Sequence, residues 1–179
     1  MQDSITLIFS AMMLVLLLIF FPLYNLFERQ DDMSYTTALR TTTNFIDQIR
    51  SKGYIDEQML HELINDLSTT GNLYDIQMEA HRQLFLQDDT HIYSVGYAID
   101  YTNDIFGYTS TGVENISHVG LTLKNDVYYL KKGDKVYITV KNSNVTLATV
   151  LLNFLKLTDN TEKIHIRYGG TVSEASWDF

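Results

Sequence analysis

A long apolar segment without charged residues lies near the start of the sequence. No Asp, Glu, Lys, Arg or His occurs between Asp3 and Glu28, and residues 4–27 are almost wholly apolar. At about 1.5 Å per helical residue this segment reaches roughly 36 Å, which is enough to cross a hydrocarbon core of roughly 30 Å. It therefore predicts a membrane-spanning helix, and no other feature of the sequence constrains the fold as strongly.

Two other interpretations fit this segment less well. A cleavable signal peptide has a basic start, an apolar run of about 7–15 residues and a small-residue cleavage site, whereas this chain begins MQDS and its longer run is followed by Glu28 and Arg29. A buried core helix that is apolar on all sides would need a larger protein around it. We therefore interpret residues 1–28 as a retained anchor, in which Pro22 predicts a kink.

Composition limits the functions open to the rest of the chain. The 179 residues carry a net charge of −9 and include no cysteine. The negative charge argues against nucleic-acid binding through phosphates, and no basic run beside the anchor favours anionic lipids. Without cysteine the chain has no disulfides and no thiolate chemistry. The length after the anchor suits one ordinary domain or two very small ones.

Helical periodicity continues beyond the anchor. Large apolar residues recur at mostly helical intervals over residues 33–49, which predicts one long helix that runs to about Arg50 and ends near Gly53. A break at Asp31 and Asp32, with a separate surface helix after it, remains an alternative. Three parts follow from this reading: a transmembrane anchor (1–28), a helical stalk (29–53) and a globular head (54–179).

The head has the pattern of an α+β fold with a mainly antiparallel sheet. Asp56 is placed to cap a second helix that extends to Leu67, and Thr146 to cap a short apolar helix over 147–155. A Gly-Asp turn at Gly133 predicts a hairpin over 127–141, and Gly169 with Gly170 predicts a bend. Alternating or apolar runs predict further strands at 76–80, 91–99, 120–124 and 163–168.

We find no sequence pattern typical of catalysis, of a cofactor or of a metal site. The histidines lack metal-binding spacing, the acidic segments 100–104 and 159–162 do not complete a calcium loop, and no nucleophile elbow occurs. We therefore expect no enzymatic activity and no cofactor. A hydrolase that uses Asp100 and Asp104 is the weakest of the hypotheses considered.

Several short phrases of the chain resemble the TadE-type, pilin-like proteins of Gram-positive bacteria. The phrases are GYID at 53–56, TGNLYDI at 70–76, LKKGDKVYITVKN at 130–142, TLA at 146–148 and YGG at 168–170. Together with the uncharged N-terminal helix, this resemblance implies a minor pilin or pseudopilin of a tight-adherence, type IV pilus-like or conjugation-associated system. It also implies a head outside the cytoplasm. The segment 3–9 lacks the glycine and glutamate typical of cleaved type IV prepilins.

In such a system the apolar helix packs against neighbouring helices. The small or flexible residues and the two interruptions of the apolar run are the candidate assembly positions: Ser10, Ala11, Met12, Met13, Pro22 and Asn25. Ordinary contact with lipid is an equally good explanation of these residues.

The leading hypothesis is a non-enzymatic structural or assembly component of a pilus-like or conjugative machine. Its expected partners are membrane lipid and other pilin-like or secretion-machine subunits, with a homo-oligomer as a further option, but not nucleic acid. The alternative is a single-pass extracytoplasmic sensor or ligand-binding domain. Arg29 and Arg40 follow the anchor, and taken alone they lean weakly towards a cytoplasmic head.

Overall fold

A computed structural model describes residues 2–87, 92–101, 105–108, 121–123, 126–154 and 164–173. The helices are α1 (Gln2–Lys52), α2 (Glu57–Ser68) and α4 (Leu147–Phe154). The strands are β1 (Tyr54–Asp56), β2 (Tyr74–Gln87), β3 (Ile92–Tyr101), β4 (Phe106–Tyr108), β5 (Leu121–Leu123), β6 (Val127–Tyr129), β7 (Lys135–Asn142) and β8 (His165–Thr171). The α+β class predicted from the sequence is confirmed.

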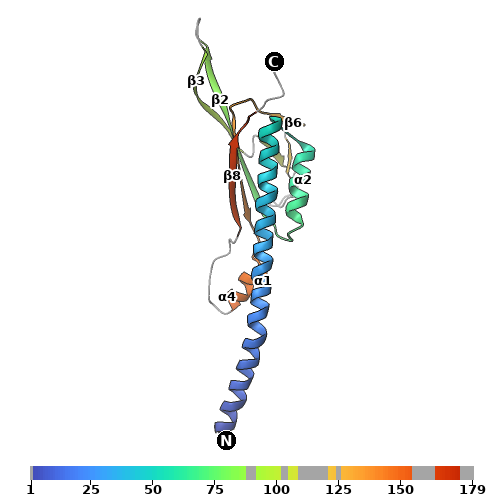
Figure 1. Ribbon diagram of the computed structural model, residues 1–179, viewed down its shortest axis with the longest axis vertical. Helices are drawn as coiled ribbons and strands as arrows, with labels where there is room; N and C mark the ends of the chain where they lie inside the picture. The colour runs from blue at the N-terminus through green and yellow to red at the C-terminus, as the bar shows by residue number, and fades with distance from the viewer. Residues whose placement is uncertain are drawn as a thin grey trace.

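Helix α1 is continuous over its whole length and forms the long axis of the molecule (Figure 1). It passes through Pro22, Asp31 and Asp32 without a break, so the single long helix is confirmed and the alternative of two helices is wrong. The helix also ends where the sequence predicts, near Gly53. Gly53 adopts a φ of 75°, and its N–H donates to the Ile49 carbonyl at 2.8 Å, as in a glycine-terminated helix.

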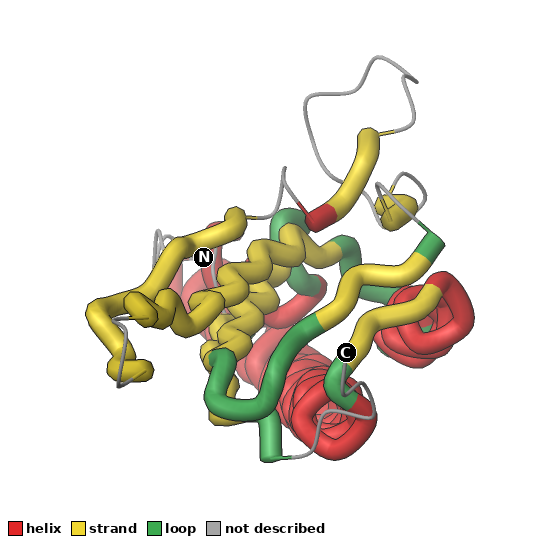
Figure 2. Tube along the Cα trace, turned by 90° about the horizontal axis from the view of Figure 1, so that it is seen from above, coloured by secondary structure: helices red, strands yellow, loops and turns green. Residues whose placement is uncertain are grey.

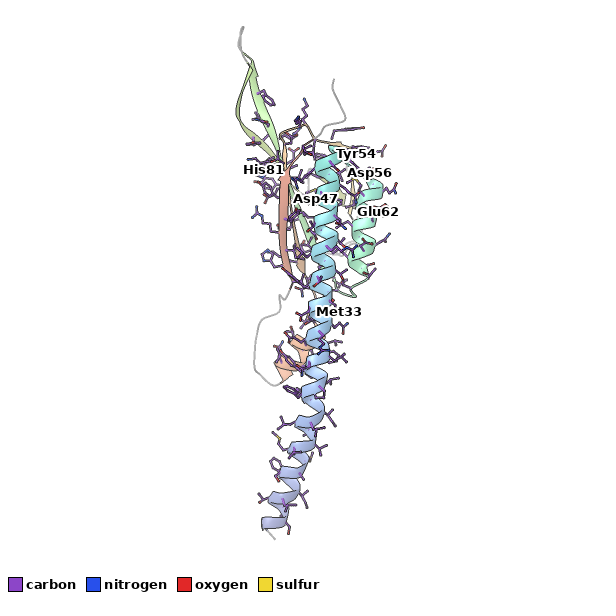
Figure 3. The ribbon with its side chains drawn as sticks, viewed as in Figure 1. Met33, Asp47, Tyr54, Asp56, Glu62 and His81 are labelled. Atoms are coloured by element: carbon purple, nitrogen blue, oxygen red, sulfur yellow. The ribbon has the colours of Figure 1, made fainter. Side chains whose placement is uncertain are left out.

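The main sheet has the antiparallel order β3-β2-β7-β8. One face of this sheet is apolar and packs towards the second half of α1, so that sheet and helices form two adjacent layers (Figure 2). The core draws on both layers: Ala38, Phe45, Ile46 and Ile49 of α1, and Ile76, Met78, Ala80, Val136, Ile138, Val140 and Ile166 of the sheet are buried. Alternation along the strands places polar residues such as His81 on the opposite face (Figure 3).

Helix α2 forms as its local sequence predicts. The Met59 N–H donates to the Asp56 carboxylate at 2.7 Å, which confirms Asp56 as the N-cap. The apolar side chains on one face are buried, and the helix lies against α1 (Figure 1). The turn at residues 69–71 then leads into β2.

The predicted hairpin over 127–141 is wrong in its pairing. A turn does form at the predicted place, where Gly133 has a φ of 94° and the Asp134 N–H donates to Lys131. However, β6 pairs with β1, whereas β7 pairs with β2 and β8. The Asp134 carboxylate accepts hydrogen bonds from the N–H groups of Lys131 and Gln83, so the turn is a corner between two sheets.

The predicted bend at Gly169 and Gly170 is also wrong, because both residues lie inside β8, opposite Tyr137 and Val136. Their lack of a side chain serves close packing. A Cβ on Gly170 would collide with the Arg50 side chain, whose Nε donates to the Thr171 carbonyl at 3.1 Å. Gly170 therefore lets α1 approach the edge strand of the sheet, whereas a Cβ on Gly169 would collide with Tyr137 and Val136 of β7.

The remaining predicted elements agree with the structure where it describes them. β2, β3, β5 and β8 occupy the four predicted strand regions, and α4 begins at Leu147, after Thr146. Residues 91, 104, 120, 124, 155 and 163, and the acidic segment 159–162, lie outside the described residues.

Candidate functional site along the helix and at its junction with the head

The first half of α1 extends away from the head and is solvent-exposed (Figure 1). Among the described residues, α1 is the one helix long and apolar enough to cross a membrane, and none of its most apolar stretch is buried. The candidate assembly residues all lie on this exposed half: Ser10, Ala11, Met12, Met13, Pro22 and Asn25. Their side chains therefore face whatever surrounds the helix.

The structure brings only some of these candidates onto one face. At about 100° per residue, Ala11, Pro22 and Asn25 fall within about 60° of one another, whereas Met12 and Met13 point in other directions. The Ser10 hydroxyl donates to the Leu7 carbonyl of its own helix at 3.1 Å. Ala11, Pro22 and Asn25 therefore form one face of the helix, which we call the free face.

The opposite face of α1 is covered by the rest of the chain. Phe20, Tyr24 and Phe27 are half-buried and Asp31 is buried, and by the same helical geometry they share one stripe with the core residues of the second half. On the side of the free face, Met33 is 72% exposed although it lies close to the head (Figure 3). One side of α1 thus supports the head while the other remains open.

A polar pocket of about 220 Å³ lies where α1 meets the head. Its walls come from α1, from the α2–β2 turn and from the β7–α4 connection. The Thr146 hydroxyl donates to the buried Asp31 carboxylate at 2.8 Å, which ties α4 to α1. The pocket lining is Gln30, Asp31, Ser34, Thr70, Gly71, Asn72, Asn144, Val145, Thr146 and Leu147.

Sequence reasoning missed this pocket because its walls are far apart in the chain. Asp31 and Thr146 are separated by 115 positions. The Asn144 side chain accepts from the Leu73 N–H at 2.9 Å and donates to Asn72 at 3.1 Å, which fixes two of the walls together. The predicted helix cap at Thr146 was the sequence signal that could have indicated this contact, because a buried capping hydroxyl also needs an acceptor for its own proton.

Asp100, the candidate for acid chemistry, belongs to a hydrogen-bonded cluster inside the head. Arg82 donates to both oxygens of its carboxylate, at 2.9 and 3.1 Å, and the Tyr128 hydroxyl donates to it at 2.5 Å. Burial and this carboxylate raise the pKa of Tyr128 well above its usual value. The cluster joins β2, β3 and β6, and its contacts are those of a structural element.

Asp104, the second acid of the hydrolase hypothesis, lies outside the described residues. The described residues contain no group of three His, Cys, Asp or Glu side chains that could hold a metal ion. In the main sheet, the His81 ring lies 3.4 Å from the Glu79 carboxylate and next to the rings of Tyr97 and Tyr137.

Comparison with protein-family models, curated proteins and solved structures finds no match to this chain. The described residues offer two candidate functional surfaces: the exposed apolar half of α1 with its free face, and the polar pocket at the junction.

Proposed function

We propose that this chain is a non-enzymatic, membrane-anchored assembly component, similar to a minor pilin or pseudopilin, of a pilus-like or conjugative secretion machine. The observation that carries the proposal is α1 itself. One continuous helix has an exposed apolar first half and a second half packed into an antiparallel α+β head. In such machines an apolar helix rests in the bilayer and packs against neighbouring helices, while the head stands outside it.

The free face supports a role in helix packing. Ala11 offers a small side chain, which allows close approach of a second helix in lipid. Asn25 offers an amide that can hydrogen-bond to a partner helix near the end of the apolar segment. Because the head occupies the opposite side of α1, a partner helix can reach this face without a clash with the head of the same chain.

Site-directed crosslinking tests the proposal. The chain has no cysteine, so Asn25→Cys introduces a single reactive group on the free face, and Glu62→Cys introduces one on the exposed side of α2 as the matched control (Figure 3). In membranes of the native host we expect Asn25→Cys to capture pilin-like or secretion-machine subunits, identified by mass spectrometry, and Glu62→Cys to capture fewer. Repeated capture of this chain alone would contradict the proposal.

The proposal includes a head outside the cytoplasm, although Arg29 and Arg40 after the anchor weakly favour a cytoplasmic head. Protease treatment of intact cells tests this part separately. We expect the head to be digested without lysis. A head that resists protease until the cells are lysed would place it in the cytoplasm and would overturn this part.

The junction pocket favours one second candidate, an extracytoplasmic sensor or ligand-binding domain. Its polar lining suits a small polar solute, although 220 Å³ is below the volume of about 300–1,000 Å³ typical of drug-sized ligand sites. A ligand that binds only the folded head would raise its melting temperature. A screen of small polar solutes should give a shift that Asn72→Ala abolishes if this candidate is correct.

A further inference from the structure

Helix α4 is a short apolar helix that lies beside α1, on the side of the sheet nearest the exposed apolar half (Figure 1). Its sequence, LATVLLNF, contains no charged residue. The hydrogen bond from Thr146 to Asp31 fixes its first turn to α1. Its position in the fold is therefore held by a buried polar contact as well as by apolar packing.

The two faces of α4 have different surroundings. Ala148 and Thr149 are completely buried, and by helical geometry Leu147, Val150 and Leu151 share the other side. Leu147 is 55% exposed and Val150 is 51% exposed, and Val145 just before the helix is 44% exposed. The outward face of α4 thus presents apolar side chains, with the exposed amide of Asn153 at its edge.

The level of α4 along α1 indicates what covers this face. The half-buried residues of α1 beside the head begin at Phe20 and continue through Tyr24 and Phe27, and these are the last turns of the apolar segment. A hydrocarbon core of about 30 Å takes up about 20 helical residues, so a bilayer around the segment that starts at Ser4 ends close to Tyr24. Tyrosine is enriched at this boundary between acyl chains and headgroups.

We infer that the outward face of α4 (Leu147, Val150 and Leu151) inserts into the headgroup boundary of the bilayer that α1 spans. The head then has two contacts with lipid, the anchor and α4, which together fix its height and tilt above the membrane. In the same turns of α1, on the side that the head leaves open, Leu26 is 60% exposed. Short apolar helical faces of this kind bind at the boundary through their buried area. The inference rests on membrane anchoring by α1 and does not require assembly into a machine.

Spin labelling of the full-length protein in phosphatidylcholine vesicles tests the inference. Because the chain has no cysteine, Val150→Cys and Leu147→Cys each carry a single nitroxide label on the outward face of α4. Leu16→Cys in the anchor and Gln58→Cys on α2 are the lipid and water controls. The measurement compares collisions with oxygen, which is concentrated in the acyl region, with collisions with a water-soluble nickel chelate.

We expect the labels at Val150 and Leu147 to prefer oxygen, as the label at Leu16 does, while the label at Gln58 prefers nickel. Nickel preference at both α4 sites would overturn the inference. Spin–spin broadening at α4 that disappears on dilution with unlabelled protein would assign this face to a second copy and would also overturn it. If the label at Leu16 preferred nickel, membrane anchoring itself would fail. Nickel preference at the α4 sites together with oxygen preference at Leu16 would overturn this inference and leave the proposed function intact.

Discussion

The two halves of α1 share one helix but differ in what surrounds them. In the first half, apolar side chains cover every side and are exposed, for example Ile19 at 60%. In the second half, threonines are frequent and only one face is apolar, but that face is buried, for example Ile46 at 0%. A helix makes its backbone hydrogen bonds within itself, so it can be packed against its own chain on one side or surrounded by lipid on all sides. The angular distribution of apolar residues distinguishes the two cases.

Substitution of one isoleucine in each half should show the difference between the two halves most clearly. Ile46→Ala leaves a cavity in the core between α1 and the sheet, and we expect it to lower the free energy of unfolding of the head by about 3 kcal/mol. Ile19→Ala, in the exposed half, should change it by less than about 0.5 kcal/mol. Denaturant unfolding of both full-length variants in the same detergent, followed by near-UV circular dichroism, measures the difference. Equal effects would show that Ile19 also packs against the head.

The sequence predicted those features of the molecule whose causes are local. The cap at Asp56, the end of α1 at Gly53 and the apolar period of α2 depend on a few neighbouring residues, and each formed as predicted. The pairing of β6 depended on β1, which lies far away in the chain, and so the hairpin signal at Gly133 misled. The junction pocket was missed for the same reason, because Asp31 meets Thr146 only in the folded chain.

Asp31 lies at the boundary between the two halves, and its removal should release α4 rather than unfold the head. In Asp31→Ala the buried Thr146 hydroxyl loses its charged acceptor and keeps only the Thr149 hydroxyl, at a cost of about 2 kcal/mol. We expect the amides of α4 to exchange with deuterium about 30-fold faster, while those of the main sheet change little. Asp32→Ala, one position along on the exposed side, is the control and should leave the exchange of α4 unchanged. Uniformly faster exchange in the sheet would contradict a local role.

Substitution of Tyr128 tests how strongly the free energy of unfolding of the head depends on its hydrogen bond to Asp100 as the pH rises. Its pKa is raised by burial and by Asp100, so below about pH 10 the phenol is neutral in both the folded and the unfolded chain, and its stabilising effect is complete. Above that pH the unfolded chain loses the proton more readily, and the free energy of unfolding falls. Tyr128→Phe should cost about 1 kcal/mol at neutral pH, since the site is only half-buried.

Above pH 10 the stability of Tyr128→Phe should fall less steeply than that of the wild type. A slope remains, because burial also raises the pKa of Tyr74. Denaturant unfolding at a series of pH values from 7 to about 11 measures both slopes. Parallel curves for the two proteins would mean that folding does not raise the pKa of Tyr128.

Asn25→Leu should have the smallest effect on the isolated protein and is the sharpest test of the free face. Asn25 is exposed and has no role in the core, so the free energy of unfolding in detergent should change by less than about 0.5 kcal/mol. Leucine keeps the size and suits lipid but cannot hydrogen-bond, so any effect must come from a lost polar contact with a neighbouring helix. We therefore expect crosslinking from Ala11→Cys, on the same face, to decrease in the Asn25→Leu background. Crosslinking that remains unchanged would mean that Asn25 reaches only the headgroup region, and that the free face packs through its small residue alone.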